Sequence, residues 1–188
     1  MRKPLQHYPG KAPLTCFGVQ RPKANHQKQD HNMASLRNNT MKIQLSKPEH
    51  INGWMALVEQ VRDAFPGLET AEAMAEHRAT VLQFIQASSA ICALEAGRVV
   101  GALLFSKENS ILCFLAVDPA YRRQHIARQM VDFMLTQMER GKAITVTTYR
   151  EGDPNGVAAR AFYKRLGFCE GRLTEEFGCP VQEFILNH

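Results

Sequence analysis

The feature of this sequence that most constrains its fold is an almost wholly apolar run, residues 111–117, that ends at Asp118-Pro119. A continuous apolar run of this length is typical of a strand covered on both faces. Pro119 cannot donate to a sheet ladder and biases Asp118 away from helical angles, so the strand is expected to end there. From about Gln124, apolar residues recur at helical spacing until Gly141, a stop signal. The pattern predicts a buried strand, a short loop and a helix.

The start of that helix has the physical properties of an anion site. Its first backbone N–H groups have no partner within the helix, and the macrodipole is positive there. Arg122, Arg123 and Arg128 add positive charge around the same point. An ordinary strand-to-helix turn with solvated arginines explains the spacing equally well, so the pattern alone leaves both interpretations open.

Two motifs carry a resemblance to a known family. Residues 122–127, Arg-Arg-Gln-His-Ile-Ala, resemble the Arg/Gln-x-x-Gly-x-Gly/Ala signature of the GNAT superfamily of acetyl-CoA-dependent acyltransferases. Residues 115–121 resemble the strand and turn that lead into it. Residues 159–168, Ala-Arg-Ala-Phe-Tyr-Lys-Arg-Leu-Gly-Phe, resemble the family's Ala-x-x-Phe-Tyr-x-x-x-Gly-Phe segment. Both motifs in this order, with a strand pattern between them, are hard to explain by chance, and the resemblance runs from about Met41 to the end.

The resemblance implies one GNAT domain over residues 41–188 with an α/β (α+β) fold. Three layers are expected, with helices flanking a mixed, mostly antiparallel twisted sheet that has a central parallel pair. Strands are predicted at 42–45, 91–94, 99–105, 111–117, 143–149, 168–176 and 181–186, and helices at about 51–61, 70–85, 124–138 and 157–166. The helical connection between strands 111–117 and 143–149 is a parallel crossover. Ser46 and Glu49 have capping-box spacing before the first helix.

The basic charge of the chain is concentrated in residues 1–40. The net charge is +5; residues 1–40 hold seven basic residues and one acidic residue, whereas residues 41–188 hold 16 basic and 17 acidic residues. This segment has few aliphatic residues and no periodicity, so we predict a disordered basic tail. A nucleic-acid-binding arm is the alternative, but few aromatics interleave with the charges, and nucleic acid is not an expected partner. A natural start at Met33 or Met41 is a third interpretation.

The expected compartment is the cytoplasm. No apolar run reaches the length of a membrane span, and the N-terminus lacks the apolar core of a secretory signal. The five cysteines are odd in number and contain no Cys-x-x-Cys pair, which argues against both a disulfide framework and a zinc site. We therefore expect free thiols, no metal and no membrane partner.

The resemblance implies that acetyl-CoA is the co-substrate. Leu115 and Val117 would offer main-chain hydrogen bonds to the pantetheine arm, in a gap between the two parallel strands. The amides of residues 123–128 would hold the diphosphate. The predicted cofactor-binding residues are Leu115, Ala116, Val117, Arg122, Arg123, Gln124, His125, Ile126, Ala127, Arg128, Asn155 and Phe162.

Two positions depart from the family pattern. His125 stands where a glycine is expected, so its side chain would crowd the diphosphate or narrow the allowed backbone angles. Gly156 stands at the position of the family's common asparagine, and Asn155 precedes it by one residue.

The implied reaction is direct attack of an amine on a thioester, for which the amine must be neutral and the leaving thiolate stabilised. Tyr163 matches the tyrosine that protonates the thiolate in family members; the alternative is a tyrosine that anchors its helix on the sheet. Strand 111–117 contains no carboxylate, so the candidate base is Glu151, with Asp153 beside it. A solvated turn is the alternative there. His77, expected as a surface histidine, is a further candidate.

The predicted function is therefore acetyl transfer from acetyl-CoA to a primary amine of a small molecule or peptide in a ternary complex. A non-catalytic acyl-CoA-binding or regulatory module is the alternative. Trp54, Phe65 and Phe177 suggest a partly apolar wall for the acceptor, whose identity the sequence does not specify. The oligomeric state is also open, a homodimer included.

Overall fold

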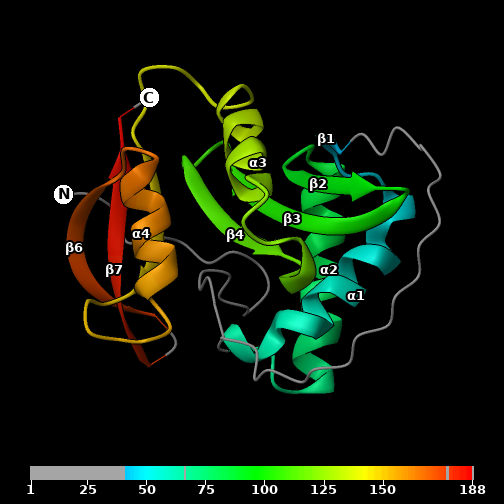
Figure 1. Ribbon diagram of the computed structural model, residues 1–188, viewed down its shortest axis with the longest axis horizontal. Coiled ribbons are helices and arrows are strands. Elements are labelled where there is room, and N and C mark those ends of the chain that lie inside the picture. Colours follow the sequence, from blue (N-terminus) through cyan, green and yellow to red (C-terminus); the bar gives the residue numbers. More distant parts are fainter. Residues whose placement is uncertain (1–40, 66, 177, 188) are drawn as a thin grey trace, which may run out of the picture.

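The computed structural model describes residues 41–65, 67–176 and 178–187 (Figure 1). The predictions for the basic tail over residues 1–40 and for Phe177 lie outside these residues. The described strands form one seven-stranded sheet in the order β1-β2-β3-β4-β5-β7-β6. The strands are β1 Lys42–Leu45, β2 Ala90–Glu95, β3 Arg98–Ser106, β4 Ile111–Val117, β5 Ile144–Tyr149, β6 Cys169–Glu176 and β7 Cys179–Leu186. The helices are α1 Ile51–Val61, α2 Ala71–Gln86, α3 Ile126–Leu135 and α4 Val157–Arg165.

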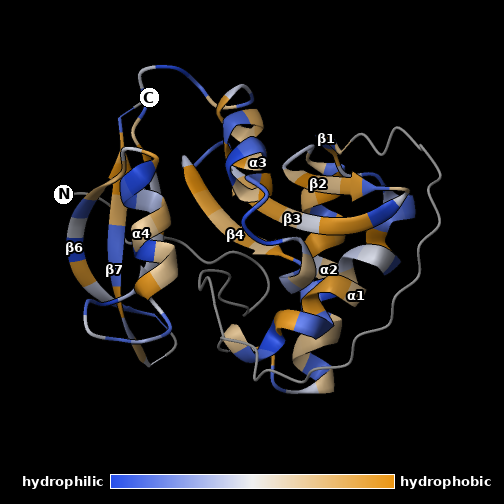
Figure 2. Ribbon diagram, in the orientation of Figure 1, coloured by the Kyte–Doolittle hydropathy of each residue, from blue (hydrophilic) through white to orange (hydrophobic). Residues whose placement is uncertain are grey.

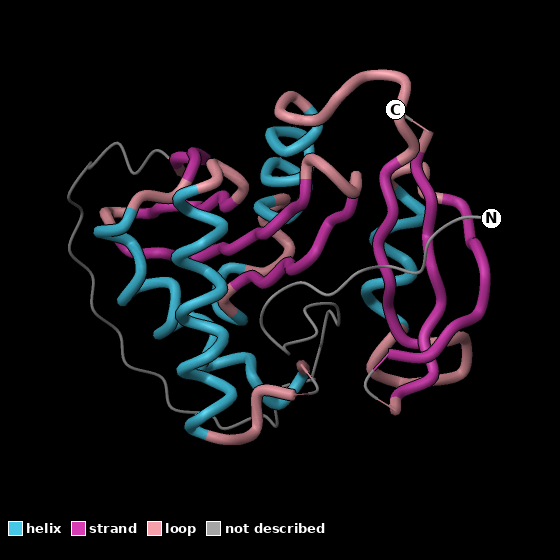
Figure 3. The backbone as a smooth tube through the Cα atoms, turned by 180° about the vertical axis from the view of Figure 1, so that it is seen from behind, coloured by secondary structure: helices cyan, strands magenta, loops and turns pink. Residues whose placement is uncertain are grey.

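The predicted three-layer α+β fold is confirmed. Helices α1 and α2 cover one face of the sheet, whereas α3 and α4 cover the other (Figures 1 and 3). Each face has its own apolar core: α1 and α2 pack with the side chains on one face of β2, β3 and β4, and α3 and α4 pack with those on the opposite face. Strands β3 and β4 are strongly hydrophobic along their length, as Figure 2 shows. Their burial on both faces explains why they lack polar alternation.

The sheet consists of two antiparallel parts joined at one place. Strands β1 to β4 form one part, and β5, β7 and β6 form the other. The predicted parallel pair β4–β5 joins them, but its ladder is confined to a single residue pair, Ile111 with Thr145. Thr145 N also donates to Ser110 O, 2.9 Å away. Beyond this point β4 and β5 diverge (Figures 1 and 3).

Strand β4 contains a bulge that the sequence did not reveal. Leu104 of β3 pairs with Phe114, but its neighbour Phe105 pairs with Leu112, so Cys113 is an extra residue in β4. A bulge bends its strand and increases the local twist. It lies close to the place where β4 leaves β5, and it places Phe114 against the α1–α2 core.

The predicted capping box at Ser46 and Glu49 is wrong. The chain forms a short 3₁₀ turn there, η1 (Pro48–His50), before α1. His50 does the capping, because its Nδ1 accepts a hydrogen bond from Lys47 N at 2.9 Å. Ser46 is buried at the end of β1 instead. The interpretation failed because pairing with β2 extends to Ser46, whose N donates to Ala90 O, so its side chain is buried beside the sheet and not at the helix start.

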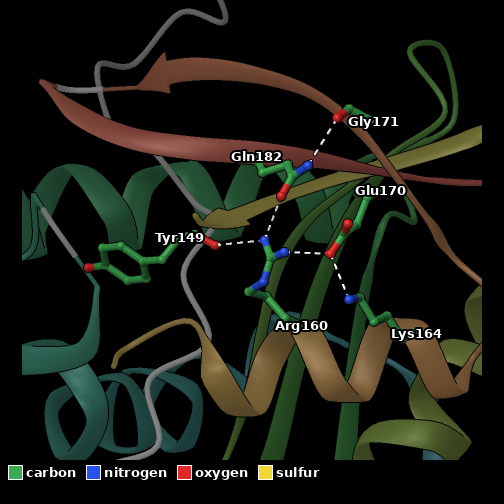
Figure 4. Close-up of polar contacts among 6 residues, drawn as sticks. All are labelled: Tyr149, Arg160, Lys164, Glu170, Gly171 and Gln182. Atoms are coloured by element: carbon green, nitrogen blue, oxygen red, sulfur yellow. Dashed lines mark hydrogen bonds and ion pairs between the residues drawn. The ribbon is translucent and has the colours of Figure 1, made fainter. Parts of the chain in front are cut away.

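Helix α4 is attached to β5, β6 and β7 through a buried arginine (Figure 4). Arg160 Nη1 donates to Gln182 Oε1 at 2.7 Å and to Tyr149 O at 3.4 Å. Its Nη2 donates to Glu170 Oε1, which Lys164 Nζ also contacts at 2.7 Å. The hydrogen bond from Lys164, together with the charges of Lys164 and Arg160, lowers the pKa of Glu170. A buried guanidinium with hydrogen-bond partners on three strands fixes the position of its helix.

Within the described residues, no helix is long and apolar enough to cross a membrane. The same part of the chain contains no group of three or more His, Cys, Asp or Glu side chains that could hold a metal ion.

Candidate functional site

The loop between β4 and α3 is held in place by Asp118. Its Oδ1 accepts from Ala120 N at 2.9 Å, which closes the turn that Pro119 begins. Its Oδ2 pairs with Arg98 Nη2 of β3 at 2.6 Å. The carboxylate is almost fully buried, so the loop starts from a fixed point on the sheet.

The end of this loop has an unusual backbone conformation. Arg123 (φ 64°) and His125 (φ 61°, ψ 13°) have left-handed backbone angles, and α3 begins immediately afterwards. Gln129 N donates to His125 O, but the amides of residues 123–128 donate to no acceptor within the described part of the chain. Consecutive free amides at a helix start form a concave anion site.

These amides lie at a groove of about 590 Å³ between α3 and α4. Its lining residues are Val117, Tyr121, Arg122, Arg123, His125, Ile126, Ala127, Arg128, Ala158, Phe162, Arg165 and Leu166. They include four arginines and no carboxylate. Arg128 Nε pairs with Asp132, at 3.5 Å. Arg122 is half-buried; burial lowers its pKa, with Asp118 opposing the shift, and its Nε donates to Val117 O at 3.4 Å. The groove is therefore strongly cationic and suited to a polyanion.

The edge of β4 that faces β5 offers a second set of main-chain groups. Asp118 N donates to Val100 O of β3, at 2.9 Å. Because bonding alternates along an antiparallel pair, Ala116 also faces β3, whereas the main-chain groups of Leu115 and Val117 face the divergence from β5. In the described residues the β4–β5 ladder does not reach them, although Val117 O accepts from Arg122 Nε. An extended ligand with amide groups can therefore pair with the main-chain groups of Leu115 and with the N–H of Val117.

The chain matches the model of one protein family, described as Acetyltransferase (GNAT) family, over residues 54–168. It belongs to the GNAT family. It is an acetyltransferase of that type, and acetyl-CoA is the acetyl donor that the family uses.

Solved structures with the same fold are distant in sequence. A GNAT acetyltransferase from Bacillus cereus ATCC 10987 has a TM-score of 0.63 at 14% identity, with 79% of this chain and 97% of that chain covered. The ribosomal-protein-S18-alanine N-acetyltransferase from Escherichia coli has a TM-score of 0.58 at 18% identity, covering 78% and 93%. RimL, a ribosomal L7/L12 alpha-N-protein acetyltransferase in complex with coenzyme A, has a TM-score of 0.60 at 13% identity, covering 80% and 95%. Among curated proteins, none matches this chain significantly.

The groove between α3 and α4 is lined by most of the predicted cofactor-binding residues. Those that line it are Val117, Arg122, Arg123, His125, Ile126, Ala127, Arg128 and Phe162. Leu115 and Ala116 are buried in β4, on the strand that leads into the groove. Gln124 and Asn155 are exposed and do not line it; Asn155 N donates to Asp153 Oδ1 at 2.8 Å. Arg165 and Leu166 were missed, although they follow Phe162 at helical spacing and so share its face.

Tyr163, the predicted proton donor of this GNAT protein, is buried with 3% of its surface exposed. Its ring centroid lies 5.5 Å from that of Phe168 and 5.9 Å from that of Phe184. Tyr163 belongs to the core that also contains Leu115 and Val117, but it does not line the groove. Anchoring of α4 is therefore supported, and proton donation stays a prediction.

The candidate bases differ in their surroundings. Glu151 is exposed in the turn after β5 and does not line the groove, whereas Asp153 accepts the hydrogen bond from Asn155 N in its own loop. The expectation that His77 lies on the surface is wrong: α2 buries it completely, with its ring 5.3 Å from that of Phe114. Neither ring nitrogen has a hydrogen-bond partner among the described residues, and burial lowers its pKa to about 4.

The apolar acceptor wall expected from Trp54 and Phe65 is not on the described surface. Both residues are buried in the α1–α2 core. Trp54 is fully buried because α1 presents it to the sheet, together with Leu57, Val58 and Val61.

Proposed function

We propose that this GNAT acetyltransferase transfers the acetyl group of acetyl-CoA to a primary amine of a small molecule or peptide, by direct attack in a ternary complex. The observation that carries the proposal is the run of unpaired amides, residues 123–128, at the cationic groove. A diphosphate satisfies these donors and neutralises the arginines beside them. The amides of a pantetheine arm match the main-chain groups of Leu115 and the N–H of Val117, at the edge of β4 that the β4–β5 ladder does not reach.

When bound, acetyl-CoA supplies an activated thioester carbonyl. The acceptor nitrogen forms a bond to this carbon, the bond from carbon to sulfur breaks, and the sulfur leaves as a thiolate. We assign Tyr163 as the proton donor to the departing sulfur. Its place in the core with Leu115 and Val117, and the rigid attachment of α4 through Arg160, support this role. We assign Glu151 to the removal of the proton from the acceptor ammonium, directly or through water.

A peptide α-amine is a specific candidate for the acceptor. Two proteins with the same fold are named as enzymes that acetylate ribosomal proteins: the S18-alanine N-acetyltransferase and RimL. Strand β5 ends at Tyr149, and Glu151 is exposed in the turn that follows. Its carboxylate can attract a cationic amine at this end of the strand.

Two measurements test the proposal. Calorimetry with acetyl-CoA is expected to show binding, and absence of binding at high-micromolar ligand would reject it. Release of free thiol is then followed with a panel of amines, aminoglycosides and peptides with free N-termini. Turnover with at least one acceptor is expected.

Tyr163→Phe distinguishes the catalyst from a non-catalytic acyl-CoA-binding module. The variant keeps the ring packing, so acetyl-CoA affinity is expected to stay unchanged while turnover falls by roughly 10²-fold. Unchanged turnover in this variant would remove Tyr163 from the mechanism. Failure of the wild type to turn over any acceptor, despite tight binding, would favour the module.

A further inference from the structure

One cation of the groove is not explained by a diphosphate at the start of α3. Arg165 is the last residue of α4 and lines the groove from the wall opposite the free amides. Its side chain makes no hydrogen bond or ion pair with any described residue. Its neighbour Lys164 is already engaged with Glu170. Arg165 therefore presents a free guanidinium to the groove.

The other three arginines belong to the wall that carries the amides. Arg122 donates to Val117 O, and Arg128 pairs with Asp132. Arg123 lies within the amide run itself, at φ 64°. These residues compensate the charge of a diphosphate on their own side of the groove, whereas Arg165 faces it from across the groove.

Acetyl-CoA carries two separate anionic groups, a diphosphate and a phosphomonoester on the ribose 3′-oxygen. We propose that Arg165 binds the 3′-phosphate, and that this contact lets the protein select acetyl-CoA over its 3′-dephospho form. The inference rests on the proposed use of the groove for acetyl-CoA. Arg165 is flanked on the groove wall by Phe162 and Leu166, which offer apolar surface for the neighbouring nucleoside. A planar guanidinium is the side chain best suited to bind a phosphate in two-point contact.

The position of Arg165 is pre-organised by the attachment of α4. Arg160, on the same helix, is bonded to Tyr149 of β5 and to Gln182 of β7. The backbone of Arg165 is therefore fixed before any ligand binds, which lowers the entropic cost of the contact. The side chain itself is exposed and free to rotate toward the phosphate.

The test is calorimetry on the full chain with CoA and with 3′-dephospho-CoA, neither of which requires a known acceptor. The wild type is expected to bind CoA at least about tenfold more tightly than 3′-dephospho-CoA, as for a charge-assisted hydrogen bond. In Arg165→Ala this ratio should fall close to one, because CoA affinity drops and 3′-dephospho-CoA affinity does not. Arg165→Gln, which preserves helix propensity, should behave like the alanine variant. Arg140→Ala removes an exposed arginine after α3 that does not line the groove, and should keep the wild-type ratio.

Each alternative outcome has a distinct meaning. Equal binding of both ligands by the wild type, or an equal loss for both ligands in Arg165→Ala, overturns the assignment of Arg165 but leaves acetyl-CoA binding intact. Failure of the wild type to bind either ligand rejects the groove as a CoA site, and this assignment with it.

Discussion

The left-handed backbone at His125 makes a strong prediction for stability. The left-handed conformation costs a residue with a β-carbon roughly 1–2 kcal/mol of folding free energy. Histidine is among the residues that tolerate this conformation better than most. His125→Gly removes that cost, but glycine loses about 0.5–1 kcal/mol more conformational entropy on folding. The balance predicts that His125→Gly stabilises the protein by roughly 0.5–1 kcal/mol.

The matched control is His125→Ala, which removes the ring but keeps the β-carbon at φ 61°. Because the strain comes from the β-carbon, this variant should be no more stable than the wild type. Urea unfolding measures both differences at an unchanged m-value. For a chain of this size the glycine variant should also melt about 1–4 °C higher.

CoA affinity provides a second measurement on the same variant. His125→Gly retains the backbone amide and removes a ring that lines the groove, so the affinity should be equal or higher. Two results would contradict the reasoning. Equal stabilisation by alanine and glycine would show that the ring, not the backbone, is responsible. A less stable glycine variant would show that the left-handed conformation costs histidine less than glycine loses in conformational entropy.

Two further predictions concern buried polar groups. Burial of neutral His77 means that the unfolded chain binds a proton near pH 6.5 and the folded chain only near pH 4, so stability should fall as the pH drops through this window. The total loss in the free energy of unfolding is about 3 kcal/mol. His77→Phe should abolish this loss, which urea titrations at several pH values measure. An unchanged pH profile in this variant would assign the loss to other groups. Arg160→Met should cost roughly 3 kcal/mol, because Gln182 and Tyr149 O lose their buried donor. The exposed control Lys164→Met should cost less than about 1 kcal/mol, and similar losses in both would refute a special role for the buried arginine.

Local chemistry explains the parts of the fold that could be predicted. Pro119 ends β4, and Asp118 closes the turn after it, because both effects act within a few residues. The hairpin between β2 and β3 turns at Ala96 and Gly97, both at positive φ, within the four residues that separate the predicted strands 91–94 and 99–105. The spacing of the two GNAT motifs also identified most of the residues that line the groove.

The sequence by itself determined the order of strands and helices, the strand–loop–helix junction and the family, because these depend on short-range periodicity and on residue identity. Only the tertiary structure decided that His77 is buried, that β4 bulges at Cys113, that Arg160 attaches α4 to β5 and β7, and that Arg165 lines the same groove as the start of α3. Each of these depends on contacts between residues far apart in the chain. Such contacts follow from how whole helices and strands pack, and no local pattern encodes which face of a helix meets which strand.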